Sequence, residues 1–102
     1  MEEKGYIYFM TNRTHNVLYI GVTNGLKRRI AEHSEGRGSM FTSRYKCHKL
    51  VYFEIFPTIE QAIVREKKLK HFKREWKNQL VETINPEWLD LSESVITDPD
   101  KL

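Results

Sequence analysis

The chain has 102 residues, the usual size of one compact domain, and dividing it would leave each half too small to bury a core. Hydrophobic residues make up 39% of the chain and charged residues 30%, and no apolar run approaches the roughly 20 residues that a membrane helix needs. The composition therefore excludes a membrane-spanning protein and indicates a soluble globular one.

The charge is unevenly distributed along the chain. Residues 1–84 carry 16 of the 17 basic and 9 of the 14 acidic residues, a net charge of +7, whereas residues 85–102 have a net charge of −4. A basic body of this kind is compatible with a polyanionic partner, although many soluble proteins share the balance. The single cysteine, Cys47, excludes an internal disulfide and favours a cytoplasmic location, and the acidic N-terminus does not resemble a secretion signal.

Three segments of the sequence predict β-strands. Each is an apolar run rich in β-branched and aromatic residues and bounded by polar, turn-forming residues, and they lie at residues 6–10, 17–22 and 50–56. The short polar segment between the first two predicts that they form a hairpin.

Helical periodicity follows the hairpin. Leu26 and Ile30 are four residues apart and share one face of a predicted helix, for which Thr23 or Asn24 is the expected N-cap. The glycine-containing segment 36–47 predicts a loop with one helical turn.

A second helical region follows the third strand. No glycine or proline interrupts residues 58–84, whose apolar residues recur at helical spacing, and a break near Lys73 is expected because one helix of that length would overrun so small a domain. The order strand, strand, helix, strand, helix, helix predicts an α+β domain over residues 1–91. Residues 92–102 are expected to form an acidic, disordered tail.

Three polar residues interrupt the helical apolar pattern. Glu66 lies between Ile63 and Leu69, where a carboxylate is costly unless it is paired, hydrogen-bonded or bound to a cation. Arg29 and His33 are four residues apart on one helix face. The residues by themselves leave two structural alternatives open: an ion pair between Glu66 and Arg29, and a His33 that is an ordinary cation at a helix end.

The predicted hairpin carries two short motifs. Its strands contain Tyr6-Ile7-Tyr8 and Tyr19-Ile20-Gly21, with ten residues between Tyr8 and Tyr19. In these motifs and their spacing the chain resembles the GIY-YIG nuclease superfamily. The first glycine of the motif is replaced by Tyr6, with Gly5 displaced by one position, and Gly21 is expected to be structural.

The resemblance extends over residues 5–91 and implies roles for further residues. Arg29 falls at the family's catalytic arginine, His33 at its frequent histidine, Glu66 at its metal-binding glutamate and Asn85 at an asparagine that commonly closes the domain. The compact length resembles small stand-alone bacterial members related to the N-terminal nuclease domain of the excinuclease UvrC. The fold that this implies is a three-stranded antiparallel sheet flanked by helices.

The activity implied by the resemblance is hydrolysis of DNA phosphodiester bonds with Mg²⁺ or Mn²⁺. Glu66 would hold the metal ion, and the planar guanidinium of Arg29 would contact phosphate. Tyr19 is the first candidate for the general base and Tyr8 the second, with His33 as a hydrogen-bond partner or alternative base. All five side chains are expected to line one concave face.

Basic side chains in the loop and the later helices are candidates for non-specific phosphate contacts, and a solvated charged face is the equally simple explanation of the helix lysines. These candidates are Arg37, Arg44, Lys46, Lys67, Lys68, Lys70, Lys73, Arg74 and Lys77. The sequence does not exclude RNA as the ligand, or a partner protein or homodimer. A nucleic-acid-binding module with little turnover remains an alternative, as does a structural protein in which Glu66 and Arg29 form a salt bridge.

Overall fold

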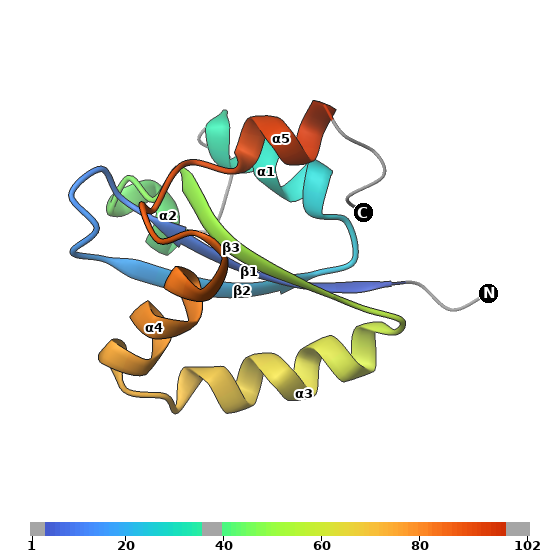
Figure 1. Ribbon diagram of the computed structural model, residues 1–102. Helices are drawn as coiled ribbons and strands as arrows, with labels where there is room; N and C mark the ends of the chain where they lie inside the picture. Colours follow the sequence, from blue (N-terminus) through green and yellow to red (C-terminus); the bar gives the residue numbers. More distant parts are fainter. Residues whose placement is uncertain (1–3, 36–39, 98–102) are drawn as a thin grey trace.

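The computed structural model describes residues 4–35 and 40–97, which form a three-stranded antiparallel sheet with helices on both faces (Figure 1). The strands are β1 (Gly5–Thr11), β2 (Leu18–Thr23) and β3 (Lys49–Phe56), in the order β2-β1-β3. The predicted α+β fold class and hairpin are confirmed. Among the described residues, no helix has the length and apolar character to cross a membrane.

The central strand β1 is buried along its whole length, so both of its faces contribute to the core. Side chains alternate between the faces of a strand. Tyr6 and Tyr8 therefore belong to the hydrophobic cluster on one side of the sheet, and Ile7 and Phe9 to the cluster on the other. The two antiparallel neighbours set the register around Tyr8, which lies opposite Gly21.

The face that carries Tyr6 and Tyr8 is covered by α1 (Leu26–Ser34) and α5 (Ser92–Thr97) (Figure 1). The residue at the N-cap of α1 is Gly25, without a side-chain cap, so the expected cap at Thr23 or Asn24 is wrong. The physical reason is local, because the Thr23 hydroxyl oxygen accepts the Gly25 N–H at 3.1 Å and stabilises the turn before the helix.

The expectation of a disordered tail from residue 92 is also wrong for residues 92–97. Val95 is fully buried and packs with Leu91 against the α1 side of the sheet. Residues 98–102 lie outside the described part of the chain. The apolar residues Val95 and Ile96 in an otherwise acidic segment were the sequence signal for this short helix, and the burial of Val95 offsets the ordering of the backbone. The expected helical turn in the loop is α2 (Met40–Arg44).

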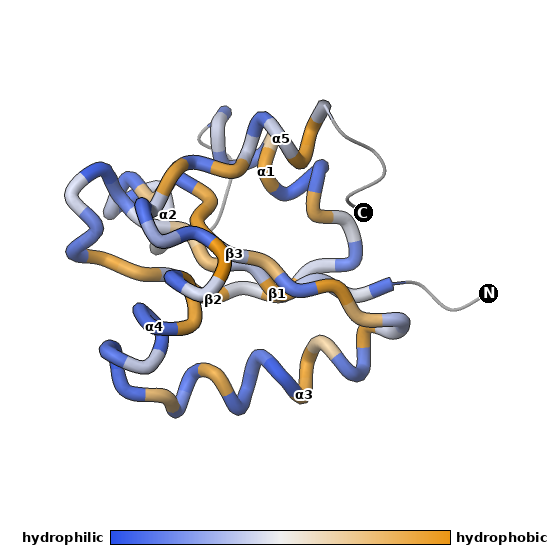
Figure 2. The backbone as a smooth tube through the Cα atoms, in the orientation of Figure 1, coloured by the Kyte–Doolittle hydropathy of each residue, from blue (hydrophilic) through white to orange (hydrophobic). Residues whose placement is uncertain are grey.

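The opposite face is covered by α3 (Ile59–Lys70) and α4 (Arg74–Ile84), with the predicted break between them (Figure 1). The Thr58 side chain caps α3 by accepting the Gln61 N–H. Along α3, hydrophobic and hydrophilic residues alternate at helical spacing (Figure 2), and its buried residues, Ala62 and Leu69, face the sheet.

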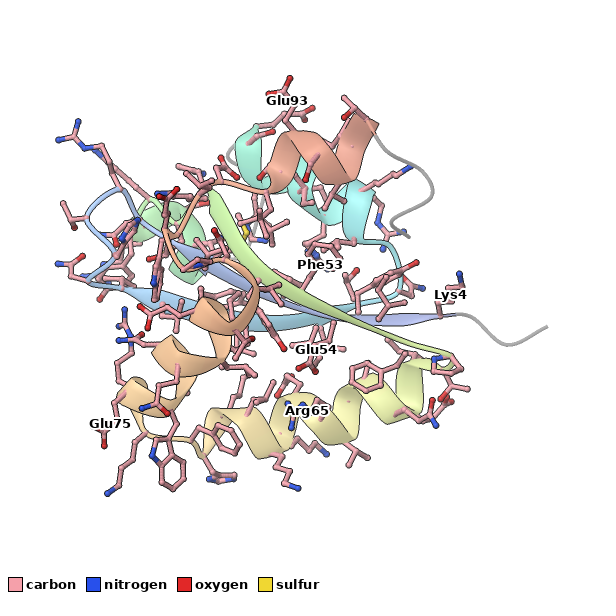
Figure 3. The ribbon with its side chains drawn as sticks, viewed as in Figure 1. Lys4, Phe53, Glu54, Arg65, Glu75 and Glu93 are labelled. Carbon is pink, nitrogen blue, oxygen red and sulfur yellow. The ribbon has the colours of Figure 1, made fainter. Side chains whose placement is uncertain are left out.

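A polar network fastens α3 to β3. The Arg65 guanidinium donates to both carboxylate oxygens of Glu54, at 3.0 and 3.1 Å, and the Tyr52 hydroxyl donates to the same carboxylate. Glu54 and Arg65 point toward each other between the strand and the helix, whereas Phe53 points to the other side of β3 (Figure 3). Bidentate pairing satisfies both partly buried charges and fixes the rotation of α3 about its axis.

The two outer strands, β3 and β2, differ in what lies along their outer edges. The segment after α4 runs along β3, where the Leu91 N–H donates to the Leu50 carbonyl at 2.7 Å and the Leu50 N–H donates to Asp90 Oδ1 at 3.2 Å. In the described sheet, β2 pairs with β1 alone. The β2 edge is therefore the side of the sheet at which a ligand can approach backbone and side chains together.

Candidate active site

Three aromatic rings meet between β1, β2 and α1. The ring centroids of Tyr8 and Tyr19 are 6.1 Å apart, and the His33 ring lies 5.8 Å from Tyr8 and 6.4 Å from Tyr19. The hairpin places the two tyrosines on the same face because Tyr19 pairs with Met10, two residues after Tyr8. The structure therefore brings together the two tyrosines and the histidine that the sequence had singled out.

Arg29 and Glu32 complete this cluster from α1. The Arg29 guanidinium and the Glu32 carboxylate form an i,i+3 ion pair at 3.6 Å. His33 is 2% exposed, yet within residues 4–35 and 40–97 neither of its ring nitrogens has a hydrogen-bond partner, and the buried Arg29 Nε and Glu32 Oε1 have none there either. Buried polar atoms without hydrogen-bond partners are uncommon in folded proteins because they lose water without replacing it, so this cluster is suited to a polar ligand or water.

The surroundings of Tyr8 and His33 hold both side chains in their neutral forms. Burial raises the pKa of the Tyr8 hydroxyl well above its usual range, and Tyr19, which is hydrogen-bonded to it, raises it further. Burial and the neighbouring Arg29 charge lower the pKa of His33. A buried His33 is not an ordinary solvent-exposed cation at a helix end, and the raised pKa of Tyr8 favours the protonated hydroxyl, which can donate a hydrogen bond.

Gly21 is required by the position of the Tyr8 ring. A Cβ atom at Gly21 would collide with the far end of that ring, which lies across the glycine on the neighbouring strand. Glycine is required at the displaced position 5 for a different reason. A Cβ atom at Gly5 would collide with Ala62 and Ile59 of α3. Both glycines thus permit close approach, one on each face of the sheet.

Glu66 belongs to the other layer of the molecule. Successive helical residues are separated by about 100°, so Arg65 and Glu66 lie on opposite flanks of the buried line from Ala62 to Leu69. Because Arg65 reaches Glu54 on β3, Glu66 lies on the flank that faces the β2 side of the sheet. Its side chain is 14% exposed.

The expectation that all five side chains line one concave face stays a prediction. Tyr8, Tyr19, Arg29 and His33 lie on the α1 side of the sheet, whereas Glu66 approaches from the α3 side. The strand–helix connection after β3 carries the chain to the opposite face of the sheet, which helical periodicity does not reveal.

The predicted alternative of a Glu66–Arg29 ion pair is not what the two residues form. Glu66 pairs with Lys70 at 3.4 Å, one turn further along α3, and Arg29 pairs with Glu32. Sequence reasoning missed Glu32, the carboxylate that does lie beside the tyrosines. Its signal was its spacing, three residues after Arg29 and next to His33.

Asn85 closes the fold at a distance from the aromatic cluster. Its side-chain amide donates to the carbonyls of Val51 and Leu89, at 3.0 and 2.8 Å, and its carbonyl oxygen accepts the Leu89 N–H at 2.9 Å. The side chain is 4% exposed and joins the segment after α4 to β3. This geometry agrees with a domain-closing role.

The candidate phosphate-binding residues fall into two groups. Lys67 and Lys68 are exposed on α3, whereas Lys70 pairs with Glu66 and Lys73 lies 6.0 Å from the Trp76 ring centroid. Arg37 lies outside the described residues.

The remaining basic candidates also have structural neighbours. Arg74 donates to the His15 and Asn16 carbonyls, at 2.6 and 3.3 Å, and so holds the hairpin turn against α4. Burial, together with Arg74 and Lys70, lowers the pKa of Lys77. In the loop, Arg44 lies 5.8 Å from the Tyr45 ring centroid and Lys46 is exposed with a left-handed backbone, φ 56°.

The candidate site offers a divalent metal ion carboxylate oxygen ligands, but the described residues do not supply a complete set of protein ligands. In residues 4–35 and 40–97 there is no group of three or more His, Cys, Asp or Glu side chains that could hold a metal together. One mostly shielded carboxylate such as that of Glu66 fits Mg²⁺, which usually binds few protein ligands and keeps several waters.

Comparison with known proteins gives one consistent family. Residues 4–79 match the GIY-YIG catalytic domain. A UPF0213 protein from Haloquadratum walsbyi is 37% identical over 82 residues, which are 80% of this chain and 91% of that protein. One from Staphylococcus haemolyticus is 35% identical over 79 residues, covering 78% of this chain and 95% of that protein.

A solved structure is similar as well. The solution NMR structure of a UPF0213 protein from Bacillus halodurans has a TM-score of 0.55 at 29% identity, and the match covers 88% of this chain and 95% of that one. The relatives are matched over most of their length, in agreement with the expected resemblance to small members of the superfamily. The two tyrosine motifs, the sheet order and these matches together show that the chain belongs to the GIY-YIG nuclease family.

Proposed function

We propose that this protein is a divalent-metal-dependent endonuclease that hydrolyses DNA phosphodiester bonds. The observation that carries the proposal is the cluster of buried polar atoms on Arg29, Glu32 and His33, which lack hydrogen-bond partners in the described part of the chain and lie beside two tyrosine rings. A phosphate group, with its several acceptor oxygens, is a ligand that the unpartnered Arg29 Nε–H would bind. Membership of a nuclease family supports DNA as the substrate.

The two tyrosines have different roles in this proposal. Tyr19 is half-buried, lies on the edge strand and acts as the general base. Tyr8 keeps its proton because burial raises its pKa, and its hydroxyl stabilises the deprotonated oxygen of Tyr19 through their hydrogen bond. His33, neutral because burial lowers its pKa, orients the attacking water or takes up its proton.

The scissile phosphate would lie at the free edge of β2. Arg29 lies on the α1 side of the sheet and Glu66 on α3, and in this proposal the phosphodiester lies between them at this edge. A bound Mg²⁺ or Mn²⁺ supplies electrostatic stabilisation of the charge that develops on the phosphate oxygens. Glu66 would hold that ion, and Arg29 would bind a phosphate oxygen directly.

Cleavage assays with labelled DNA test the activity. Branched, nicked, single-stranded and duplex substrates are incubated with Mg²⁺, with Mn²⁺ and with a chelator, and we expect metal-dependent cleavage of at least one. Binding without cleavage of any substrate would instead favour a nucleic-acid-binding module with the nuclease fold.

Glu66→Gln tests the metal site. We expect loss of cleavage and of metal-induced changes in titration calorimetry, with DNA affinity kept or raised because a negative charge is removed. Glu60→Gln, an exposed glutamate in the first turn of the same helix, is the matched control and should behave as the wild type.

Glu32→Gln is the competing variant, since Glu32 pairs with Arg29 and its charge acts on Tyr8. If Glu32→Gln abolishes metal binding while Glu66→Gln does not, the metal site lies on α1 and the assignment to Glu66 is wrong.

A further inference from the structure

A groove of about 530 Å³ opens at the end of the sheet where β1 ends and β3 begins. It is lined by residues 11–14 of the hairpin turn, by residues 45–49 without Cys47, and by Asp90. Figure 1 shows the hairpin turn and α2 side by side at this end of the molecule. The volume falls within the roughly 300–1,000 Å³ of sites that bind small molecules.

The groove is cationic. Arg13, Lys46 and Lys49 line it together with the single carboxylate of Asp90. Asp90 Oδ1 already accepts the Leu50 N–H and both the N–H and hydroxyl of Ser92, so much of its charge is compensated by protein donors. A ligand with negative charge is therefore favoured over a cationic one.

The groove also offers ring surface. Tyr45 is 43% exposed, and the neighbouring Arg44 guanidinium lies near its ring. His48 is exposed as well, and its Nδ1–H donates to the His33 carbonyl at 2.9 Å. That hydrogen bond fixes the imidazole and connects the groove to the end of α1, the helix that carries Arg29 and His33. Aromatic rings beside cations are the combination that binds a nucleobase and its phosphate together.

We propose that this groove binds one unpaired nucleotide of the DNA substrate, with the base against Tyr45 and the phosphate among Arg13, Lys46 and Lys49. The inference rests on the proposed nuclease function and deepens it. A base within a duplex has both faces covered by its neighbours, so a stacking side chain can reach it only once it has left the stack. The groove thus selects single-stranded or branched DNA over continuous duplex.

Binding without metal tests the groove independently of cleavage. Fluorescence anisotropy in the presence of a chelator is measured with a labelled single strand, and with a blunt duplex of the same sequence. We expect the wild type to bind the single strand more tightly. Tyr45→Ala should weaken single-strand binding about tenfold, within the range measured for loss of one base–aromatic stack, and leave duplex binding unchanged.

Two variants serve as controls. Tyr45→Phe keeps the ring and should bind as the wild type. Lys4→Ala removes a charge near the start of β1, at the end of the sheet far from the groove (Figure 3), and should leave the preference for single strands intact, whereas Arg13→Ala should reduce it. Circular dichroism verifies that each variant is folded.

Three outcomes would overturn the proposal: equal loss of affinity for both DNAs in Tyr45→Ala, no loss for either, or a free nucleoside monophosphate that competes as strongly as the oligonucleotide. The last would identify a mononucleotide pocket unrelated to strand binding. A Tyr45-dependent preference for single strands without metal-dependent cleavage would keep the groove and reject the nuclease. Metal-dependent cleavage without a Tyr45-dependent preference for single strands would support the nuclease and reject the groove as a nucleotide-binding site.

Discussion

The two faces of the sheet differ in whether their buried polar side chains are hydrogen-bonded. On the α3 side, Glu54 and Arg65 satisfy each other through two hydrogen bonds. On the α1 side, Arg29 Nε, Glu32 Oε1 and both nitrogens of His33 are buried without a hydrogen-bond partner among the described residues. Both faces rest on the same central strand β1.

This difference between the faces suggests that one face contributes mainly to stability and the other mainly to activity. A charge pair with complete hydrogen bonding holds a helix against the sheet and stabilises the fold. Buried polar groups without hydrogen bonds destabilise the fold, and a bound ligand that hydrogen-bonds to them removes this cost. We therefore expect substitutions on the α1 side to change activity more than stability, and those in the Glu54–Arg65 network to do the opposite.

The largest expected effect concerns Tyr19 on the α1 side. Tyr19→Phe removes the proposed general base and should lower kcat by about 100- to 10,000-fold, the usual contribution of such a group. Tyr8→Phe, whose hydroxyl stays protonated, should cost less. Single-turnover cleavage rates measure both. A larger loss in Tyr8→Phe would exchange the two roles.

Arg29→Ala should come next. Loss of one preorganised donor to a transition state costs about 100- to 1,000-fold in kcat, and DNA affinity should fall too because a phosphate contact is lost. The control is Arg28→Ala, an adjacent exposed arginine that donates to Asn24 at 2.8 Å. Equal rates for the two variants would remove Arg29 from the site.

On the other face, Glu54→Gln should lower the free energy of unfolding by about 1.5–3 kcal/mol, the usual worth of hydrogen bonds to a charged group, because it removes the carboxylate that Arg65 and Tyr52 share. Denaturant titration measures the change. The cleavage rate at a temperature where the variant is folded should equal that of the wild type. A variant as stable as the wild type but inactive would contradict the division between the faces.

The smallest effect is a dependence of stability on pH. Burial, together with Arg29, keeps the pKa of His33 in the folded protein below its unfolded value of about 6.5. The unfolded chain therefore binds a proton first as the pH falls, so the free energy of unfolding should decrease from about pH 7 downward. His33→Asn should make this decrease shallower. His15, whose pKa is also lowered by burial and by Lys49 and Arg74, accounts for part of what remains.

The sequence by itself determined the elements and the family. Alternating apolar residues and polar turns placed the three strands, and helical spacing with a break near Lys73 placed α3 and α4. Two motifs and their spacing identified the four residues Tyr8, Tyr19, Arg29 and His33. These residues lie in one hairpin and the helix that follows it, so their spacing in the sequence was enough to predict that they lie together.

The tertiary structure alone decided which side of the sheet each helix covers. Glu66 and Glu32 both interrupt helical patterns, but the chain passes to the opposite face after β3, so Glu32 lies on the α1 side with the tyrosines and Glu66 lies on α3. The burial of Val95 against Leu50 and the hydrogen bond from Asn85 to Val51 also depend on partners 34 or more residues away in sequence. Such contacts follow from packing between layers, for which the periodicity of any one segment carries no signal.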